Sequence, residues 1–308
     1  MTSSTVEERH TRSWVPPFPL DIAGVLAPLR RGAGDPAFQA DDAGVRWLAA
    51  NTASGVGTLA VRRSGGAVEA TGWGPGGLSL VDGVPALLGA ADDDSDFVAH
   101  HQIVAELRRR NPHLRLGSTG RVWDVLVPSI LEQKVTGYEA RRSWRELCRR
   151  FGTPAPGPAP AGMFAPPTPA AVLAITDWQW HAAGVDGARR RALIAAARVA
   201  GRLERAASLR GKEGRSLLRK VPGIGVWTAA EVAQRVWGDP DAVSVGDFHI
   251  PSVVGHVLLG RKLDDAGMLE VLAPYSPQRQ RVVRYIEAGG ISRPRFGPRY
   301  AGRDYRAL

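Results

Sequence analysis

The stretch from Ser216 to Ile250, SLLRKVPGIGVWTAAEVAQRVWGDPDAVSVGDFHI, holds the signals that decide the fold. Pro222 ends a short helix, and the glycines Gly223 and Gly225 permit a tight hairpin with exposed backbone amides. A second helix is predicted from about Val226, because its apolar residues recur with the helical period. The pattern therefore indicates two helices joined by a hairpin, with free amide donors that can bind a phosphate group.

A candidate catalytic residue follows the hairpin. Residues 238–240 predict a turn, residues 242–245 form a short β-type run, and Asp247 opens another helix from Phe248 onward. Aspartate is a common helix N-cap without a catalytic role. A helix N-terminus also stabilises a negative charge, which suits a catalytic carboxylate. The residues alone leave both interpretations of Asp247 open.

Composition and charge narrow the class of protein. The chain has 308 residues, a net charge of +10 and 44% hydrophobic residues, which predicts a folded chain of two packed units. The basic surface indicates an acidic polymer as partner, although solubility alone also explains it. No apolar run approaches the roughly 18 residues that span a bilayer, and the first residues lack an apolar signal core. We therefore expect a cytoplasmic protein with no membrane contact.

The chain divides into four predicted segments. Residues 1–17 are a polar, flexible leader, and residues 18–98 carry glycine-rich β-type runs typical of a small α+β domain. Residues 99–288 are mainly helical, and residues 289–308 form a basic tail in which five arginines alternate with aromatic residues. Such a tail is predicted either to contact a nucleic-acid backbone or to pack against the body of the protein.

Two unusual stretches interrupt these segments. Asp92–Asp96 is a contiguous acidic run, whereas calcium loops space their carboxylates, so a helix cap or a solvated turn at the domain boundary is favoured over a metal site. Residues 153–169 carry seven prolines and two glycines. They predict an extended loop, which is either an insertion or a connection between helical layers.

Together these motifs resemble the helix-hairpin-helix DNA glycosylases, and among them the branch of bacterial 3-methyladenine DNA glycosylase II. In that family a catalytic aspartate at a helix start follows the hairpin at the distance of Asp247. Residues 123–136, which include PSILEQK, resemble the family's helix that ends in an Ile-Leu-x-Gln motif and enters the minor groove. Residues 184–190 resemble its turn before the next helix. The resemblance covers residues 18–290 and implies a mostly α, two-lobed helical fold preceded by a small antiparallel-sheet domain.

The resemblance also implies a function in base excision repair. A monofunctional DNA glycosylase would flip an alkylated base, most simply a purine, out of damaged double-stranded DNA and hydrolyse its N-glycosidic bond. Asp247 would stabilise the charge that develops on the sugar. Trp227 stands where bifunctional relatives carry a nucleophilic lysine, which favours base release without strand cleavage. The implied DNA contacts are Gln133, Lys134, Gly223, Gly225, Val226 and Thr228.

The implied substrate pocket departs from the family's pattern. Its residues are Trp227, Glu231, Tyr285 and Ile286. Glu231 replaces an aromatic residue, Ile286 stands where the branch has a tryptophan, and Lys134 replaces an apolar wedge. A glycosylase with another lesion preference and a non-catalytic DNA-binding protein therefore stay open as alternatives. Trp227 as a core residue and Gln133 as a solvent-facing residue stay open as well.

The resemblance requires no cofactor. It implies a structural monovalent cation at the hairpin, held by the backbone carbonyls of Arg219, Val221 and Ile224. The single cysteine, Cys148, excludes a four-cysteine iron–sulfur cluster and is expected as a buried free thiol. Nothing in the sequence demands an oligomer, so we expect a monomer that acts on DNA.

Overall fold

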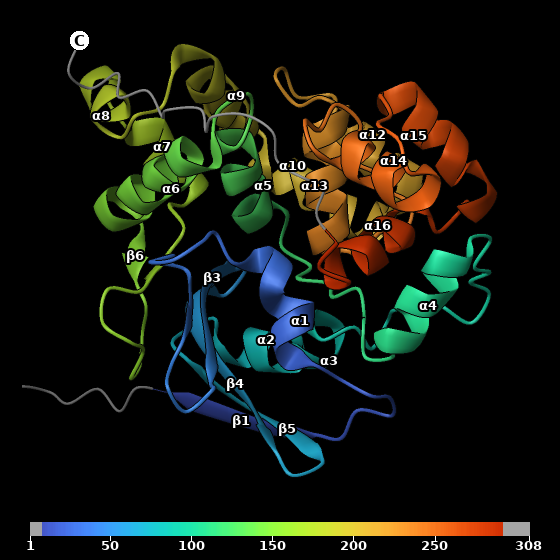
Figure 1. The fold of residues 1–308 in the computed structure, drawn as a ribbon. Coiled ribbons are helices and arrows are strands. Elements are labelled where there is room, and N and C mark those ends of the chain that lie inside the picture. The colour runs from blue at the N-terminus through green and yellow to red at the C-terminus, as the bar shows by residue number, and fades with distance from the viewer. Residues whose placement is uncertain (1–7, 292–308) are drawn as a thin grey trace, which may run out of the picture.

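The computed structural model describes residues 8–291 and places a small sheet at one end of a larger group of helices (Figure 1). Within these residues, no helix is long and apolar enough to cross a membrane. The prediction of a basic tail over residues 289–308 falls mostly on residues 292–308, which lie outside the described residues.

The sheet has five antiparallel strands in the order β1-β5-β4-β3-β2. They are β1 (Arg9–Trp14), β2 (Phe38–Ala40), β3 (Arg46–Thr52), β4 (Gly55–Ser64) and β5 (Ala67–Trp73). Apolar side chains on alternate positions, such as the paired Leu48 and Leu59, face one side of the sheet. There they form a separate core with α1 (Ile22–Leu26), α2 (Gly77–Asp82) and α3 (Val84–Leu87).

The first strand corrects the predicted flexible leader. Residues 9–14 pair with β5 along their whole length, from Arg9 opposite Trp73 to Trp14 opposite Val68. Strand pairing needs only backbone groups, so the mostly polar sequence RHTRSW can form an edge strand. It lacks the apolar alternation from which strands are recognised in a sequence.

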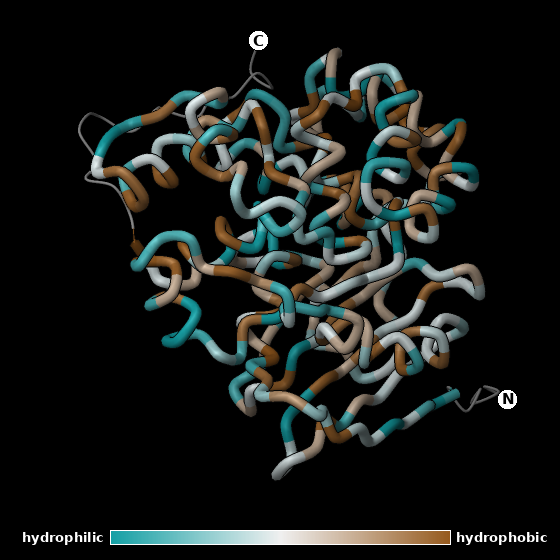
Figure 2. Tube along the Cα trace, turned by 90° about the vertical axis from the view of Figure 1, so that its right-hand side faces the viewer, coloured by the Kyte–Doolittle hydropathy of each residue, from teal (hydrophilic) through white to brown (hydrophobic). Residues whose placement is uncertain are grey.

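The helical part has two cores and therefore two lobes. One core surrounds α5 (Val122–Leu131), in which nine of ten residues are buried. Its other helices are α6 (Gly137–Phe151), α7 (Pro169–Ala174), α8 (Asp177–Ala182), α9 (Gly187–Arg198), α10 (Ala200–Leu203), α11 (Ala206–Leu209), α12 (Gly211–Leu218) and α13 (Val226–Val236). Hydrophobic and hydrophilic residues alternate along these helices (Figure 2), as in amphipathic helices packed on a core.

The second core joins a helix that precedes α5 to the last helices of the described chain. It is built from α4 (Gln102–Arg110), α14 (Ile250–Leu259), α15 (Asp265–Leu272), the 3-10 turn η2 (Ala273–Tyr275) and α16 (Arg279–Ala288). The two lobes and the small antiparallel sheet before them confirm the predicted fold class.

The acidic run at the end of the sheet domain is partly a solvated turn, as predicted, with Asp93 and Asp96 exposed, but Asp92 forms a buried ion pair that the sequence did not predict. The side chain of Asp92 is 3% exposed and accepts hydrogen bonds from Arg281 at 2.6 and 3.1 Å and from the amide of Leu116 at 3.0 Å. Arg281 is fully buried in α16. These bonds offset the cost of burying the carboxylate, and they tie the start of the helical part to its last helix.

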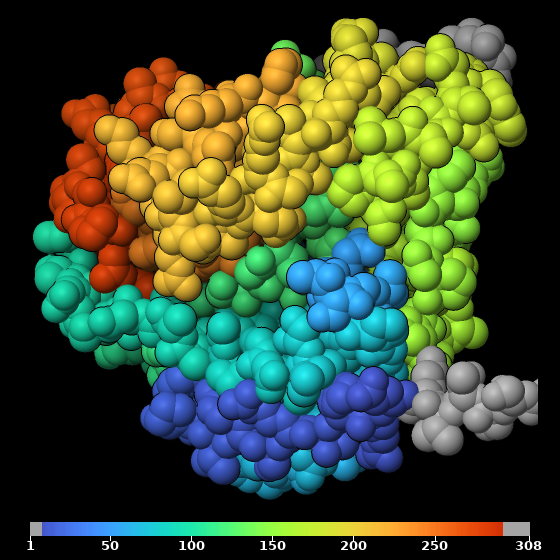
Figure 3. Space-filling view, turned by 180° about the vertical axis from the view of Figure 1, so that it is seen from behind, coloured from blue at the N-terminus to red at the C-terminus, as the bar shows by residue number. Residues whose placement is uncertain are grey.

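The proline-rich residues 153–169 connect α6 to α7 and also fasten the sheet to the helices. They contain two short paired strands, β6 (Thr153–Pro154) and β7 (Phe164–Ala165). The amide of Phe164 donates to the carbonyl of Pro36 at 2.8 Å, and the side chain of Asn51 donates to the carbonyl of Pro166 at 3.0 Å. From behind, this yellow-green segment runs down one side of the molecule toward the blue sheet (Figure 3).

Candidate active site

The hairpin between α12 and α13 has the geometry that its glycines predict. Gly223 has a φ of +88°, and a Cβ added there would lie 2.7 Å from the Cβ of Ala192 in α9. The amide of Ile224 donates to the carbonyl of Val221 at 3.0 Å and closes the turn. At Gly225 nothing lies within 4 Å of an added Cβ. The start of α13 therefore faces open space, and its first amides, which lack acceptors within the helix, can receive a phosphate oxygen.

Gln133 fastens the end of α5 to this hairpin. Its Nε2 donates to the carbonyl of Gly223 at 2.9 Å and to Oγ1 of Thr228 at 2.8 Å. Lys134 follows with an exposed side chain and a φ of +53°, and Val226 at the start of α13 is 44% exposed. The structure thus brings the two predicted DNA-contacting segments together. Thr228 is buried, so its side chain holds Gln133 and does not face a ligand.

Asp247 lies just before α14, which begins at Ile250, two residues later than predicted. Its Oδ1 accepts the amides of His249 at 2.7 Å and Ile250 at 3.0 Å, and its Oδ2 accepts Nε1 of Trp227 at 3.0 Å. Three N–H donors therefore fix this carboxylate and stabilise its negative charge. The cap interpretation is thus confirmed by these hydrogen bonds, and it does not conflict with the catalytic interpretation, which stays a prediction.

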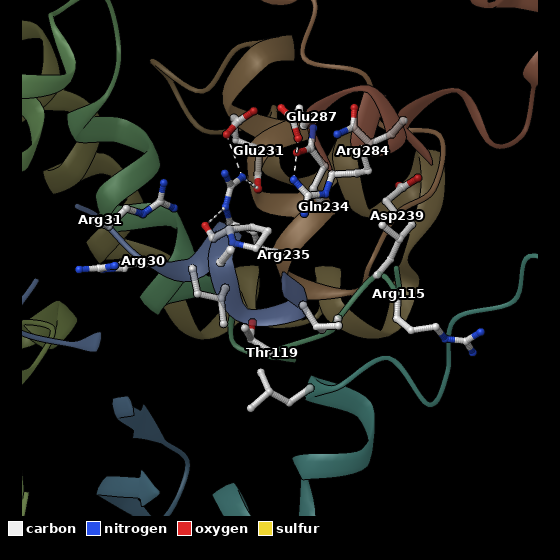
Figure 4. A pocket seen from close by; sticks show the side chains of 18 of the residues that line it. Arg30, Arg31, Arg115, Thr119, Glu231, Gln234, Arg235, Asp239, Arg284 and Glu287 are labelled. Atoms are coloured by element: carbon white, nitrogen blue, oxygen red, sulfur yellow. Dashed lines mark hydrogen bonds and ion pairs between the residues drawn. The ribbon is translucent and has the colours of Figure 1, made fainter. Parts of the chain in front are cut away.

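A cavity of about 530 Å³ opens beside Asp247, between the sheet domain and the helices (Figure 4). This volume lies within the range of about 300–1,000 Å³ found for small-molecule sites. One wall of the cavity comes from the sheet domain and consists of the 3-10 turn η1 (Ala27–Leu29) and the two residues after it, Arg30 and Arg31. A second wall comes from residues 115–117 and 119. The helices α13 and α16 supply Glu231, Gln234, Arg235, Gln280, Arg284 and Glu287.

The cavity is lined by charged, hydrogen-bonded side chains. Arg235 donates through Nη1 to the carboxylate of Glu231 at 2.8 Å and through Nε to the carbonyl of Pro28 at 2.9 Å (Figure 4). Burial lowers the pKa of Arg235, but the charges of Glu231, Glu132 and Glu287 and the hydrogen bond to Glu231 together raise the pKa above its ordinary value. Within the described residues, the imidazole of His249 is the one aromatic ring in the lining.

Two predicted pocket residues do not line the cavity. Tyr285 and Ile286 are 2% and 0% exposed and belong to the second helical core. Residues 280, 284 and 287 of α16 share the face toward the cavity, and the helical period turns Tyr285 and Ile286 to the other face. Of the remaining two, Glu231 lines the cavity as predicted, and Trp227 contacts Asp247 through its indole N–H without lining it.

Sequence reasoning missed the residues that complete the cavity. No pattern in the sequence places Pro28, Arg30 or Arg31 next to a helix two hundred residues away. A signal did exist for Arg235, because Glu231 and Arg235 are four residues apart and can pair on one face of a helix. On the polar face of α16, Arg284 and Glu287 pair at the related spacing of three residues.

The predicted cation at the hairpin stays a prediction. The carbonyl of Val221 accepts the amide of Ile224 at 3.0 Å and keeps a second lone pair for a ligand. Within residues 8–291, no cluster of three or more His, Cys, Asp or Glu side chains could hold a metal ion. Cys148 is a buried free thiol, as expected.

The sequence matches no protein-family model and no curated protein, but the structure is similar to solved structures. A 3-methyladenine DNA glycosylase from Archaeoglobus fulgidus has 13% identity and a TM-score of 0.72, and the match covers 89% of this chain and 96% of that one. An 8-oxoguanine glycosylase/lyase from Clostridium acetobutylicum, in complex with double-stranded DNA, has 12% identity and a TM-score of 0.68, with 92% and 98% covered. The chain therefore has the helix-hairpin-helix glycosylase fold that its sequence predicted.

Proposed function

We propose that the protein is a DNA glycosylase of base excision repair in which Asp247 removes a damaged base held in the cavity. One observation carries this proposal. Asp247 lines the cavity and is also hydrogen-bonded at 3.0 Å to Trp227, in the first turn after the hairpin. The surface that can bind a DNA phosphate and the cavity that can hold a base thus meet at this carboxylate. The shared fold supports the same function.

The reaction calls for a negative charge next to the sugar. When the N-glycosidic bond breaks, the base departs with the bonding electrons and C1′ gains oxocarbenium character. The Asp247 carboxylate, held by the amides of His249 and Ile250 and by the indole of Trp227, stabilises that charge. Water then adds its oxygen to C1′ and loses a proton to the carboxylate. That proton passes to the departing base when a neutral base leaves as an anion, and to solvent when a cationic base leaves as a neutral molecule. An abasic sugar remains.

The proposed enzyme is monofunctional and leaves the strand intact. Strand cleavage by a lyase needs an amine that forms a Schiff base with C1′. Among the described residues that line the cavity there is no lysine. In the first turn of α13, position 227 holds a tryptophan, whose indole N–H donates a hydrogen bond to Asp247. These features support water as the nucleophile.

Damaged double-stranded DNA is the proposed partner of a protein monomer. The open hairpin at Gly223 and Gly225, the exposed side chain of Lys134 and the start of α13 form one surface, since Gln133 binds the segments together. The net charge of +10 favours a polyanion. Amide contacts with phosphates would position the duplex without reading its sequence.

Two classes of damaged base are candidates for the cavity. Alkylated purines are the class that the sequence resemblance implies, and their positive charge makes them good leaving groups. The lining is mixed, because the guanidinium groups of Arg30, Arg31, Arg235 and Arg284 lie beside the carboxylates of Glu231, Asp239 and Glu287, and His249 alone offers an aromatic face to a cation. A second class is therefore supported by the donors of this lining. A neutral base with carbonyl oxygens would accept hydrogen bonds from such donors.

The decisive experiment compares the wild-type protein with Asp247→Asn on duplexes that carry a methylated purine or, at the same position, a carbonyl-bearing oxidised purine. We expect the wild type to release one of these bases and to leave a strand that breaks only on treatment with alkali. Asp247→Asn should bind the duplex but release no base. Asp177→Asn, in which an 83% exposed aspartate of α8 is changed, is the matched control and should behave as the wild type.

The outcomes separate the alternatives. Equal release by the wild type and Asp247→Asn would contradict the role of Asp247. Strand breakage without alkali, with a covalent adduct trapped by borohydride, would contradict the monofunctional mechanism. Tight binding without release of any base would favour a non-catalytic DNA-binding protein.

A further inference from the structure

Phe248 is a large apolar side chain that stays on the surface beside the candidate active site. It follows Asp247 directly and is 80% exposed, more than any other large hydrophobic residue among those that the structure describes. An exposed ring gives up the stabilisation that an aromatic side chain gains by burial. A phenyl ring has no hydrogen-bonding group, so it can regain this stabilisation only against another apolar or aromatic surface. Folding alone therefore does not account for a phenylalanine at this position.

The two residues beside Phe248 line the cavity, but Phe248 does not. Asp247 and His249 belong to the lining, whereas the phenyl ring lies outside it. The ring contacts the imidazole of His249 edge to face, with the ring centroids 4.9 Å apart and the ring planes at 87°. This contact holds the phenyl ring next to a ring of the cavity without placing it inside. Phe248 therefore projects outward at the mouth of the cavity.

The mouth of the cavity adjoins the surface that the hairpin offers to DNA. Trp227, in the first turn of α13, donates to Asp247 at 3.0 Å, so the start of this helix and the segment around Phe248 lie side by side. Nothing lies within 4 Å of a Cβ added at Gly225 or at Gly246, so both sides of the mouth are open. A DNA strand that binds at the hairpin and places one nucleotide at Asp247 would bring the neighbouring bases to Phe248.

A nucleotide that turns out of a duplex leaves a gap behind. The gap is about 3.4 Å high, the spacing of the bases along a strand, and the bases around it lose a stacking partner. An aromatic ring can fill this gap, because bases stack on aromatic side chains and apolar wedges enter opened base steps. The exposed ammonium group of Lys134 would instead lose its hydration among the bases. Phe248 has the chemistry that the gap requires.

We propose that Phe248 is a positioning residue that fills the gap in the base stack and thereby keeps the flipped nucleotide in the cavity. The inference rests on the proposed function, because a base must enter the cavity beside Asp247. Adjacent side chains then act on two sides of one nucleotide. His249 faces the base in the cavity, and Phe248 takes the place that the base has left. Lys134 remains free to contact a phosphate.

The preference for a gap in the base stack tests this inference without any base release. Dissociation constants are measured by fluorescence anisotropy for a duplex with an uncleavable abasic-site analogue and for the same duplex with an intact base pair. The wild type is compared with Phe248→Ala and with Phe248→Leu, which keeps an apolar wedge. Trp178→Ala is the matched control, since Trp178 of α8 is a 67% exposed aromatic residue. All three substitutions are on the surface and should leave the fold intact.

We expect the wild type to bind the abasic duplex more tightly than the intact duplex. Phe248→Ala should weaken binding to the abasic duplex about 5- to 100-fold, the usual effect of removing a side chain that stacks on a base, and should leave binding to the intact duplex unchanged. Phe248→Leu should retain most of the preference, and Trp178→Ala should keep all of it. If the wild type has no preference, or if Phe248→Ala keeps the preference, the inference is wrong.

Base release separates this inference from the proposed function. In single-turnover assays, Phe248→Ala should slow release from a duplex more than release from the same damaged strand without its complement, where no base pair has to open. An equal loss on both substrates would place the ring in the chemical step and overturn the inference. Release that does not depend on Phe248 would also overturn it and leave the glycosylase intact. A preference for the abasic duplex that depends on Phe248, without release of any base, would contradict the glycosylase and leave the inference standing.

Discussion

Replacing Gly223 by alanine should destabilise the fold for two separable reasons. The first is the backbone, because a φ of +88° costs a residue with a Cβ about 1–2 kcal/mol. The second is contact, because the new Cβ would lie 2.7 Å from the Cβ of Ala192 in α9, and overpacking of this kind costs about 1–3 kcal/mol. We expect Gly223→Ala to lower the free energy of unfolding by about 2–5 kcal/mol.

A double-mutant cycle with Ala192→Gly isolates the contact. This second change removes the methyl group that the new Cβ meets, at a cost of about 1–2 kcal/mol for a glycine and a lost methyl group inside a helix. The two single costs should therefore exceed the cost of the double variant by about 1–3 kcal/mol. Urea unfolding followed by tryptophan fluorescence measures all four proteins. Single costs that add within about 0.5 kcal/mol would refute the close contact, and a cost of Gly223→Ala below about 1 kcal/mol would refute the backbone argument as well.

Gly225→Ala is the matched change on the outer side of the hairpin. Gly225 has a φ of −87° and a ψ of −173°, which any residue adopts, and nothing lies within 4 Å of the added Cβ. Stability should change by no more than about 0.5 kcal/mol. DNA affinity should fall about tenfold, because the methyl group stands where a phosphate must approach the amides. Unchanged affinity in a fluorescence-anisotropy titration would mean that DNA does not contact this face.

Three further changes probe the site and its supports. Trp227→Phe removes the N–H donated to Asp247 and should slow base release at least about tenfold in single-turnover assays, with DNA affinity retained. Arg281→Met leaves the buried carboxylate of Asp92 without its main partner and should lower the urea-unfolding free energy by about 3–5 kcal/mol. Burial raises the pKa of Asp124 to about 6, above about 3.9 in an unfolded chain. Between pH 4 and 6 the Asp124 carboxyl is therefore protonated to a greater extent in the folded protein than in the unfolded chain. The free energy of unfolding falls by up to about 3 kcal/mol as the pH rises from 4 to 7.

Each of these predictions has its own contradicting result. For Trp227→Phe, base release at the wild-type rate would contradict the prediction and would show that the indole only packs against its neighbours. For Arg281→Met, the double change with Asp92→Asn should be milder than the single change, and an equal loss would contradict pairing as the cause. For Asp124, the variant Asp124→Asn should lose the slope between pH 4 and 7, and retention of the slope would assign it to another group.

The sequence predicts those parts of the fold whose signals are local. Prolines, glycines and the helical period mark α12, the hairpin and α13, and β-type runs mark β3, β4 and β5. The strand β1 carries no such signal, because its pairing with β5 uses backbone groups alone. The acidic run likewise carries no local signal of the buried ion pair, since Arg281, the partner of Asp92, lies 189 residues away in the sequence. A charge that is solvated and a charge that is paired in the interior look alike in a sequence.

The error at α16 has a more specific cause. The resemblance places Tyr285 and Ile286 in the pocket by their position in a family pattern, whereas the sequence of α16 itself indicates how the helix is oriented. In RQRVVRYIEA the apolar residues gather on one face and residues 280, 284 and 287 on the other. The apolar face packs on the second core, and the polar face is therefore left for the cavity. Helical periodicity was the better guide here, because it follows from the packing of this chain.

The cavity depends on the sheet domain as well as on the helices. Arg235 donates through Nε to the carbonyl of Pro28 at 2.9 Å and through Nη1 to the carbonyl and the carboxylate of Glu231 at 2.8 Å. Its remaining nitrogen, Nη2, is thus the donor left for a ligand, and its direction is set by a backbone group 207 residues earlier in the chain. In the proposed mechanism the hairpin and Asp247, which lie within 35 residues of sequence, carry the chemistry. The proposed choice of base would then depend on contacts that form only when the sheet domain and α13 fold against each other.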